Sequence, residues 1–195
     1  MSSEQIREKF LDFFKRNGHV VVPSSSLIPD DPSVLLTTAG VQQFKLYYTG
    51  ELDPVKDFGA RRVASVQRCF RTSDIESVGD ETHLTFFEML GNFSFGDYFK
   101  KEAVAWGYEF LTKDMNFALE RLSATYFDGD SEALAELKKY FPDEKIKAAG
   151  KEDNFWGPTG NEGPCGPTVE FYVDNIEVWN LVFNEFYCKA DKTLE

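Results

Sequence analysis

HLTFFEMLGNFSFGDYF, residues 83–99, contains five phenylalanines, two glycines and one of the two histidines of the chain. In an extended segment alternate side chains point to opposite faces, so His83, Phe87 and Met89 share one face while Phe86 points to the other. At helical spacing a glutamate and a glycine would interrupt the apolar stripe, so a helix fits less well. Bulky groups on both faces predict a strand whose second face is covered by helices or by a ligand.

The segment before this strand completes a hairpin. RRVASVQRCFR, residues 61–71, alternates well enough to predict a second strand. Residues 72–82, between the two strands, carry four acidic residues, one glycine and no strong apolar pattern. We therefore predict an antiparallel hairpin in which these residues form a long exposed loop.

The rest of the chain predicts helices and antiparallel strands, which indicates the α+β class. Two further strands are expected to meet in a tight turn at Asp174 and Asn175. Residues 153–168 hold four glycines and three prolines, so they are predicted to be irregular. The predicted helices cover residues 2–18, 100–114 and 131–141, and the predicted strands include 20–22, 169–174 and 176–187.

Several residues are expected to cap these helices. Ser2 and Gln5 have the spacing of a capping box, and Gly18 ends the first helix. His19, beside that glycine, is most simply a C-terminal capping residue. Ser131 is expected to cap the helix that begins there.

Composition limits the class of protein. The chain has 195 residues, of which 42% are hydrophobic, so a single domain with one core is expected. A charged N-terminus and the lack of a long apolar run predict a soluble, cytoplasmic protein with no membrane partner. The net charge of -12 argues against a broad nucleic-acid-binding surface. Three scattered cysteines, Cys69, Cys165 and Cys188, predict neither a disulfide framework nor a zinc site.

Arg71 and Phe87 each admit two interpretations. Arg71 either forms an ion pair with Asp74 or Glu76 at the base of the loop, or holds a phosphate oxygen. Phe87 is either an ordinary core residue or a platform on which a purine stacks. A cation, an acidic loop and an aromatic ring on one hairpin together favour a nucleotide site.

Residues 153–168 do not match a phosphate-binding loop. Neither GxxxxGK[ST] nor GxGxxG occurs in them, and their prolines remove backbone donors. We predict instead a rigid loop that shapes the wall of a pocket, which the large side chain of Trp156 fills or closes. Cys165 lies between a glycine and a proline with no evident basic partner, which argues against a reactive thiol.

The last two predicted strands carry a second group of candidate residues. Glu170 is either an exposed strand carboxylate or a ligand for Mg²⁺ or for a substrate amine. On the final strand, Asn180 and Val182 share a small, partly polar face that suits a short side chain and the polar end of an amino acid. The opposite face is the predicted core and contains Trp179, Leu181 and Phe183.

Beyond these residue-level arguments, the chain resembles a known family. QRCFRTSDIE, residues 67–76, followed by HLTFFEMLGNFSFGDYFK, residues 83–100, resembles the second signature motif of class II aminoacyl-tRNA synthetases, in the form typical of alanyl-tRNA synthetases. The supporting segments span almost the whole chain in the order of the family. They are PSSSLIPDDPSVLLTTAGVQQFK at residues 23–45, DNFW at 153–156, GPCGPTVEF at 163–171 and IEVWNLVFNEF at 176–186.

The resemblance implies a fold and a set of site residues. The fold would be the class II antiparallel sheet flanked by helices. Arg71 would hold the α-phosphate of ATP and act in catalysis, and Phe87 would stack on adenine. The remaining ATP-site residues would be His83, Met89 and, in contact with ATP or the tRNA acceptor end, Asp74 and Glu76. The alanine pocket would contain Trp156, Asn180 and Val182, with Glu170 as a further alanine-binding residue.

The resemblance also implies a two-step reaction. The carboxylate of L-alanine attacks the α-phosphorus of Mg²⁺-bound ATP to give alanyl-adenylate and pyrophosphate, and the 3′ end of tRNA(Ala) then takes the alanyl group. Positioning and charge neutralisation by Arg71 and Mg²⁺ would supply most of the catalysis. A monomer is expected.

The chain departs from the family pattern at its end. It stops at residue 195, before the third class II motif, so residues 1–195 are interpreted as a single, incomplete, C-terminally truncated aminoacylation domain. The tRNA-recognition, editing and C-terminal domains of the family would lie elsewhere. Two alternatives stay open: a binding module for ATP or alanine without turnover, and an amino-acid ligase of the same fold that acts on an acceptor other than tRNA.

Overall fold

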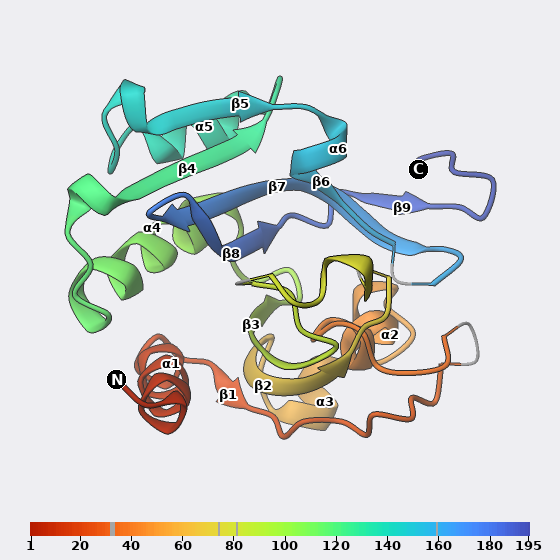
Figure 1. The fold of residues 1–195 in the computed structure, drawn as a ribbon. Coiled ribbons are helices and arrows are strands. Elements are labelled where there is room, and N and C mark those ends of the chain that lie inside the picture. The colour runs from red at the N-terminus through yellow and green to blue at the C-terminus, as the bar shows by residue number, and fades with distance from the viewer. Residues whose placement is uncertain (32–33, 74, 81, 159) are drawn as a thin grey trace. The chain divides into compact units, whose positions relative to one another are not determined.

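The computed structural model describes residues 1–31, 34–73, 75–80, 82–158 and 160–195. They divide into two compact units, each of which contains its own sheet. Unit 1 comprises Met1–Asp97 with Thr159–Asn161, and unit 2 comprises Tyr98–Pro158 with Glu162–Glu195. In Figure 1 the red, orange and yellow segments belong to unit 1, and most of the green, cyan and blue segments belong to unit 2. No helix among the described residues is long and apolar enough to cross a membrane.

Unit 1 is built on the predicted hairpin. Its three-stranded sheet has the order β1 (Val20–Val21), β2 (Arg62–Phe70) and β3 (Phe86–Ser94). The β2 and β3 strands are antiparallel, so the hairpin prediction is confirmed, although β3 starts later than predicted and runs on to Ser94. The short β1 strand pairs with β2 in the parallel sense.

Helix α1 (Ser3–Arg16) begins and ends as its sequence predicts. The Ser2 hydroxyl accepts from the Gln5 backbone, and the Gln5 side chain accepts from the Ser2 backbone, which completes the capping box. At the other end, the backbone N–H of His19 donates to the carbonyl oxygen of Phe14 at 2.9 Å. The buried imidazole lies against the same turn, with Nδ1 3.2 Å from that oxygen.

An aromatic core fills one side of the hairpin. Phe44, Val63 and Phe93 are buried at its centre. Gly91 is required there, because an added Cβ would lie 2.5 Å from the Phe93 ring. The short helices of this unit are η1 (Gln42–Phe44), α2 (Lys45–Tyr48), α3 (Pro54–Phe58) and η2 (Ile75–Ser77).

Unit 2 is organised around one long central strand, β7 (Gly163–Val173). Four of its neighbours pair with it in the antiparallel sense, and β5 pairs with β4 in the parallel sense. These strands are β4 (Leu122–Phe127), β5 (Ile146–Ala149), β6 (Phe155–Trp156), β8 (Ile176–Val182) and β9 (Phe186–Cys188). Figure 1 shows β4, β7 and β8 running side by side.

The turn between β7 and β8 is the predicted one. Asp174 and Asn175 have positive φ angles of 52° and 67°, as a tight hairpin turn between twisted strands requires. The guanidinium of Arg121 lies on the Asp174 carboxylate, with Nε–Oδ1 and Nε–Oδ2 distances of 3.1 and 3.0 Å. This ion pair links Arg121, the residue before β4, to the turn between β7 and β8.

Helices cover one face of the β7 sheet. Helix α4 (Lys100–Glu109) continues into a π-helical turn, η3 (Phe110–Asp114), and α5 (Ser131–Leu137) follows β4. Gly107 lets α4 approach the sheet, since a Cβ there would lie 2.4 Å from the Phe171 ring. Phe110 contacts Trp179 edge-on, and Leu181 of β8 and Phe183, the residue after it, are buried, which confirms the predicted core face.

Some local predictions were wrong. The cap of α5 is Asp130 rather than Ser131: the Asp130 carboxylate accepts from the backbone of Ala133 at 3.0 Å. Residues 153–168 are not irregular throughout, because they contain the end of α6 (Lys151–Asn154), all of β6 and the first half of β7. The segment 176–187 is two strands rather than one, and β4 and β5 had not been predicted.

Lys100, the first residue of α4, is a buried cation in unit 2. Its Nζ lies 3.0 and 2.9 Å from the two carboxylate oxygens of Asp130, 2.5 Å from Glu185 and 3.5 Å from Glu132. Burial favours a lower pKa for Lys100, but its hydrogen bonds to Glu185 and Asp130 outweigh that effect and raise the pKa above its usual value. The beginnings of α4 and α5 and the segment after β8 are joined by this one ammonium group.

Candidate nucleotide and amino-acid sites

Arg71 lies at the loop end of the hairpin, directly after β2. Its backbone N–H donates to the carbonyl oxygen of Thr85 at 2.8 Å, which extends the ladder by one residue. Its guanidinium Nη2 donates to the carbonyl oxygen of Thr38 at 3.1 Å, and its Cζ lies 5.4 Å from the centre of the Phe87 ring. In the strand register Phe87 is opposite Cys69, so Phe87 and Arg71 share one face of the predicted hairpin.

Of the two predicted ion-pair partners of Arg71, Glu76 is among the described residues. Glu76, in η2, is exposed, and within the described ranges it forms no ion pair with Arg71. Asp74 lies outside the described residues. Among the described residues, the carbonyl oxygen of Thr38 is the one hydrogen-bond acceptor of the Arg71 guanidinium, which has further N–H donors that suit an anion.

The segment 37–44 supports this face of the hairpin. The amide oxygen of Gln42 accepts from the Thr38 backbone at 3.0 Å and fixes the segment that holds Arg71. The backbone N–H of Gly40 lies 3.2 Å from the sulfur of Met89, two residues beyond Phe87 on the same face. The segment 37–44 therefore contacts both Arg71, through Thr38, and Met89, through Gly40.

Gln67 is a supporting residue to which we had assigned no function. It is fully buried opposite Met89, and its Oε1 accepts from the backbone of Ser25 and from the side chain of Gln43, both at 2.9 Å. The sequence signal for Gln67 is that a polar residue lies on the buried face of a predicted strand. Gln67 holds the segment near Ser25 against the hairpin.

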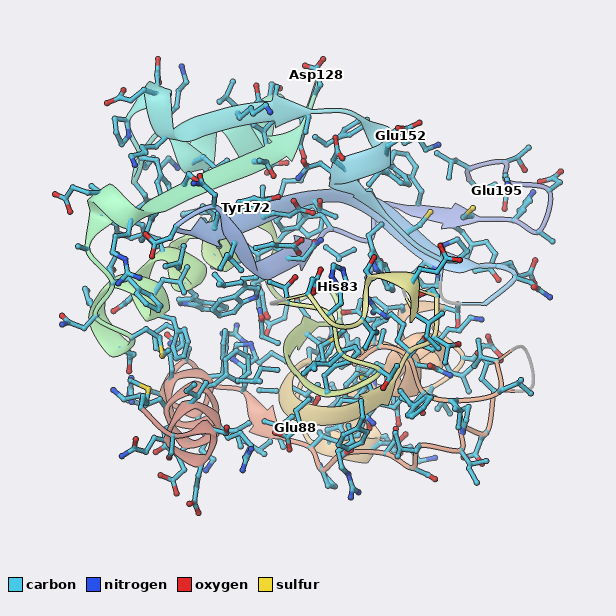
Figure 2. All side chains as sticks on the ribbon, in the orientation of Figure 1. His83, Glu88, Asp128, Glu152, Tyr172 and Glu195 are labelled. Carbon is cyan, nitrogen blue, oxygen red and sulfur yellow. The ribbon has the colours of Figure 1, made fainter. Side chains whose placement is uncertain are left out.

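His83 is placed differently. It lies in the loop between β2 and β3 (Figure 2) and is exposed, and its Nδ1 lies 2.7 Å from a carboxylate oxygen of Asp80. Backbone hydrogen bonds from His83 and Thr82, followed by the imidazole hydrogen bond, lower the pKa of Asp80 to about 2. Its pairing with Asp80 ties His83 to the loop, so the structure does not join it to Arg71 and Phe87.

In unit 2 the strand register gathers the predicted alanine-site residues on one face of the sheet. Asn180 is opposite Glu170, Val182 is opposite Thr168, and Trp156 is opposite Gly166. Directly opposed residues point to the same face, and alternate residues of β7 share that face too. Trp156, Glu170, Asn180 and Val182 therefore lie on the face of the sheet opposite to α4.

Glu170 is the charged centre of this face. It is 4% exposed, so the interpretation as an exposed strand carboxylate is wrong. Its Oε1 accepts from Nδ2 of Asn180 at 2.9 Å, and its Oε2 accepts from the hydroxyls of Thr125 at 3.2 Å and Tyr172 at 2.6 Å. Burial, with the Glu170 hydrogen bond, raises the pKa of Tyr172 above its usual range, so its phenol remains a donor.

Thr125 and Tyr172 were missed as members of this cluster. Tyr172 carried a readable signal, because it lies two positions after Glu170 in a predicted strand and so shares its face. Thr125 carried none, since its strand pairs with a segment 45 residues away.

The two groups have opposite chemical characters. The hairpin presents a guanidinium beside an aromatic ring, which suits an anion attached to a flat ring system. The sheet face of unit 2 presents a buried carboxylate that has three neutral donors and, among the described residues, no cationic partner. A buried anion of this kind suits a ligand with a positive charge.

Comparison with known proteins identifies the family. Residues 5–195 match the family described as tRNA synthetases class II (A). The chain belongs to the class II tRNA synthetases. Its sheets flanked by helices are the fold expected for a class II tRNA synthetase, so the predicted fold class is confirmed.

The relatives of this class II tRNA synthetase include several alanine–tRNA ligases. The one from Rubrobacter xylanophilus is 49% identical over 228 residues, which cover 100% of this chain and 25% of that protein. Those from Petrotoga mobilis and Thermotoga maritima are 46% and 47% identical and cover 99% and 96% of this chain. The chain spans about a quarter of the length of these curated relatives.

Proposed function

We propose that this chain supplies ATP- and alanine-binding residues for alanine–tRNA ligation. The membership in the class II tRNA synthetases and the alanine–tRNA ligases among its relatives support the reaction class. The observation that carries the substrate assignment is the buried carboxylate of Glu170, held by three neutral donors on one face with Asn180, Val182 and Trp156.

The nucleotide is assigned to the hairpin of unit 1. Arg71 holds the α-phosphate through the donors that Thr38 leaves available, and adenine stacks on Phe87. The guanidinium lies toward one side of the ring, so the purine takes the other side. Met89 lines the same face, and Asp74 and Glu76 of the acidic loop complete the proposed ATP contacts. His83 would join them only by leaving Asp80.

The amino acid is assigned to unit 2. The α-ammonium group of L-alanine replaces the missing cationic partner of Glu170 and also donates to Asn180. Trp156 and Val182 limit the space around the side chain, which favours a methyl group over larger substituents.

The proposed chemistry is that of alanine–tRNA ligation. The alanine carboxylate oxygen forms a bond to the α-phosphorus while the bond to the bridging oxygen breaks, and pyrophosphate leaves with that electron pair. Mg²⁺ enters with ATP as part of the substrate. Arg71 stabilises the charge on the α-phosphate in the transition state. In the second step the 3′ end of tRNA(Ala) takes the alanyl group and AMP leaves.

Alanine-dependent exchange of labelled pyrophosphate into ATP tests this proposal. The chain is expected to catalyse exchange with L-alanine more readily than with serine or glycine. Glu170→Gln removes the anion with little change of shape, and it is expected to reduce exchange mainly through a higher KM for alanine. Folded protein that shows no alanine-dependent exchange and no alanine binding would contradict the proposal.

A further inference from the structure

We infer that Thr125 and Tyr172 are positioning residues that set the orientation of the Asn180 amide for reading the ammonium group of the ligand. The inference deepens the proposed function, on which its ligand part rests. Its structural part concerns only four side chains of unit 2: Thr125, Glu170, Tyr172 and Asn180.

The two carboxylate oxygens of Glu170 accept from different donors. One carboxylate oxygen takes both hydroxyls, from Thr125 at 3.2 Å and Tyr172 at 2.6 Å, and the other takes the Asn180 amide at 2.9 Å. The hydroxyls come from β4 and from β7 itself, and the amide comes from β8. Contacts from three strands therefore fix the plane of the carboxylate.

The fixed carboxylate of Glu170 determines the orientation of the Asn180 amide. A carboxylate oxygen only accepts hydrogen bonds, so the neighbouring amide must present its NH₂ group to Glu170 and its oxygen away from it. The Asn180 oxygen is buried, and it has no hydrogen-bond partner among the described residues. A buried acceptor without a donor is costly, so this oxygen is aimed at a donor that arrives with a ligand.

The charge of Glu170 and the oxygen of the Asn180 amide together indicate which ligand group binds. Glu170 and the oxygen of Asn180 together offer a negative charge and a directed acceptor, which an α-ammonium group satisfies with charge and several N–H donors. L-Lactate, in which a neutral hydroxyl replaces the ammonium group, offers one donor and no charge. The cluster is therefore expected to favour L-alanine over L-lactate, and that preference is expected to depend on Thr125 and Tyr172.

The first experiment needs no ligand. Hydrogen exchange of the Asn180 side-chain NH₂ group, followed by NMR in the free chain, reports whether Glu170 holds it. Tyr172→Phe and Thr125→Val are expected to speed this exchange about tenfold, the effect of losing one hydrogen bond to a charged group. Thr125→Ser keeps the hydroxyl and is expected to restore slow exchange. Tyr126→Phe is the matched control, because this neighbouring tyrosine lies opposite Val169, on the other face of the sheet.

The second experiment compares titrations with L-alanine and L-lactate. Tyr172→Phe is expected to reduce the preference for L-alanine about tenfold and to change L-lactate binding little, with thermal stability measured in parallel. Unchanged Asn180 exchange in both Tyr172→Phe and Thr125→Val, or equal weakening of both ligands, would overturn the positioning role. Exchange that responds in both variants supports that role even where the parent chain fails to bind L-alanine, a result that would overturn the proposed function alone.

Discussion

The guanidinium carbon of Arg71 lies 5.4 Å from the centre of the Phe87 ring, across the end of one hairpin. The two residues are far apart in sequence, but the register that places Cys69 opposite Phe87 brings them to the same face. A guanidinium group and an aromatic ring in this arrangement stabilise each other through a cation–π interaction. The same pair can also serve one nucleotide, the cation by holding phosphate and the ring by stacking on the base.

Removing the guanidinium is expected to weaken ATP binding. Arg71→Ala deletes a charge-assisted contact that contributes about 1.5–3 kcal/mol, so the Kd for ATP should rise about 10- to 100-fold in a calorimetric titration. Arg68→Ala is the matched control, since Arg68 is exposed on the other face of the same strand. Equal affinities of Arg71→Ala and the parent chain would remove Arg71 from the site.

Truncating the ring tests stacking separately from charge. Phe87→Leu keeps an apolar side chain but removes the aromatic face, and a base–aromatic stack contributes about 1–3 kcal/mol. Phe86→Leu is the control, because Phe86 is 49% exposed and points to the opposite face. Fluorescence titration with a purine nucleotide should show weaker binding for Phe87→Leu and unchanged binding for Phe86→Leu; the reverse order would refute the assignment.

His19 should make the stability of unit 1 depend on pH. Burial, together with the nearby charge of Arg62, lowers its pKa from 6.5 to about 4. The unfolded chain therefore binds more protons than the folded chain between these values, so stability is full above pH 6.5 and falls as the pH drops toward 4. The loss is on the order of 3 kcal/mol.

The measurement is urea unfolding of the parent chain and of His19→Gln at pH 7 and at pH 4.5. The difference between the two pH values should be smaller in His19→Gln, whatever its absolute stability. His83→Gln, which changes an exposed histidine, should retain the difference seen in the parent chain. If all three chains lose the same stability, His19 is not the group responsible.

Gly107 is expected to be intolerant of a methyl group. A Cβ there would lie 2.4 Å from the buried ring of Phe171, and that ring stacks on Phe141 and cannot move freely. Overpacking costs about 1–3 kcal/mol, which outweighs the gain in helix propensity of up to ~1 kcal/mol. Gly150→Ala is the control, because its methyl group would meet open space and its φ of -80° suits alanine. Urea unfolding should show a loss for Gly107→Ala and a change within about 0.5 kcal/mol for Gly150→Ala.

The two hairpins were predictable because their signals are local. Alternation in residues 61–71 and 83–90, and the Asp174–Asn175 turn, are properties of a few neighbouring positions. Strand β4 was missed because its partner β7 lies 45 residues further on, and no local pattern records that pairing. The register that places Asn180 opposite Glu170 was not predictable, because the two-residue turn alone would pair Glu170 with Trp179. An irregularity between Phe171 and Tyr172 shifts the pairing by one residue.

Two prolines explain why the first half of β7 was not predicted to be a strand. Pro164 and Pro167 argued against a strand, because proline cannot donate to a ladder. In the structure this half of β7 is flanked by only two short strands, β6 and β9, so few backbone donors are needed there. Gly166 has its own reason: a Cβ would lie 1.7 Å from the carbonyl oxygen of Phe183. The glycines and prolines that predicted a loop are therefore consistent with a strand crowded by its neighbours.

The buried ammonium of Lys100 also restricts how this sequence can change over time. Asp130 and Glu185 lie far apart in the chain, yet both pair with Lys100, so replacing Lys100 alone leaves the buried carboxylate of Asp130 uncompensated, at a cost of about 3–5 kcal/mol. A neutral residue at position 100 becomes tolerable only after Asp130 has changed. In a library that varies all three positions, folded variants should therefore show linked substitutions, and independent substitution would show that the group does not act as a unit. The order in which mutations can accumulate is part of what this one side chain determines.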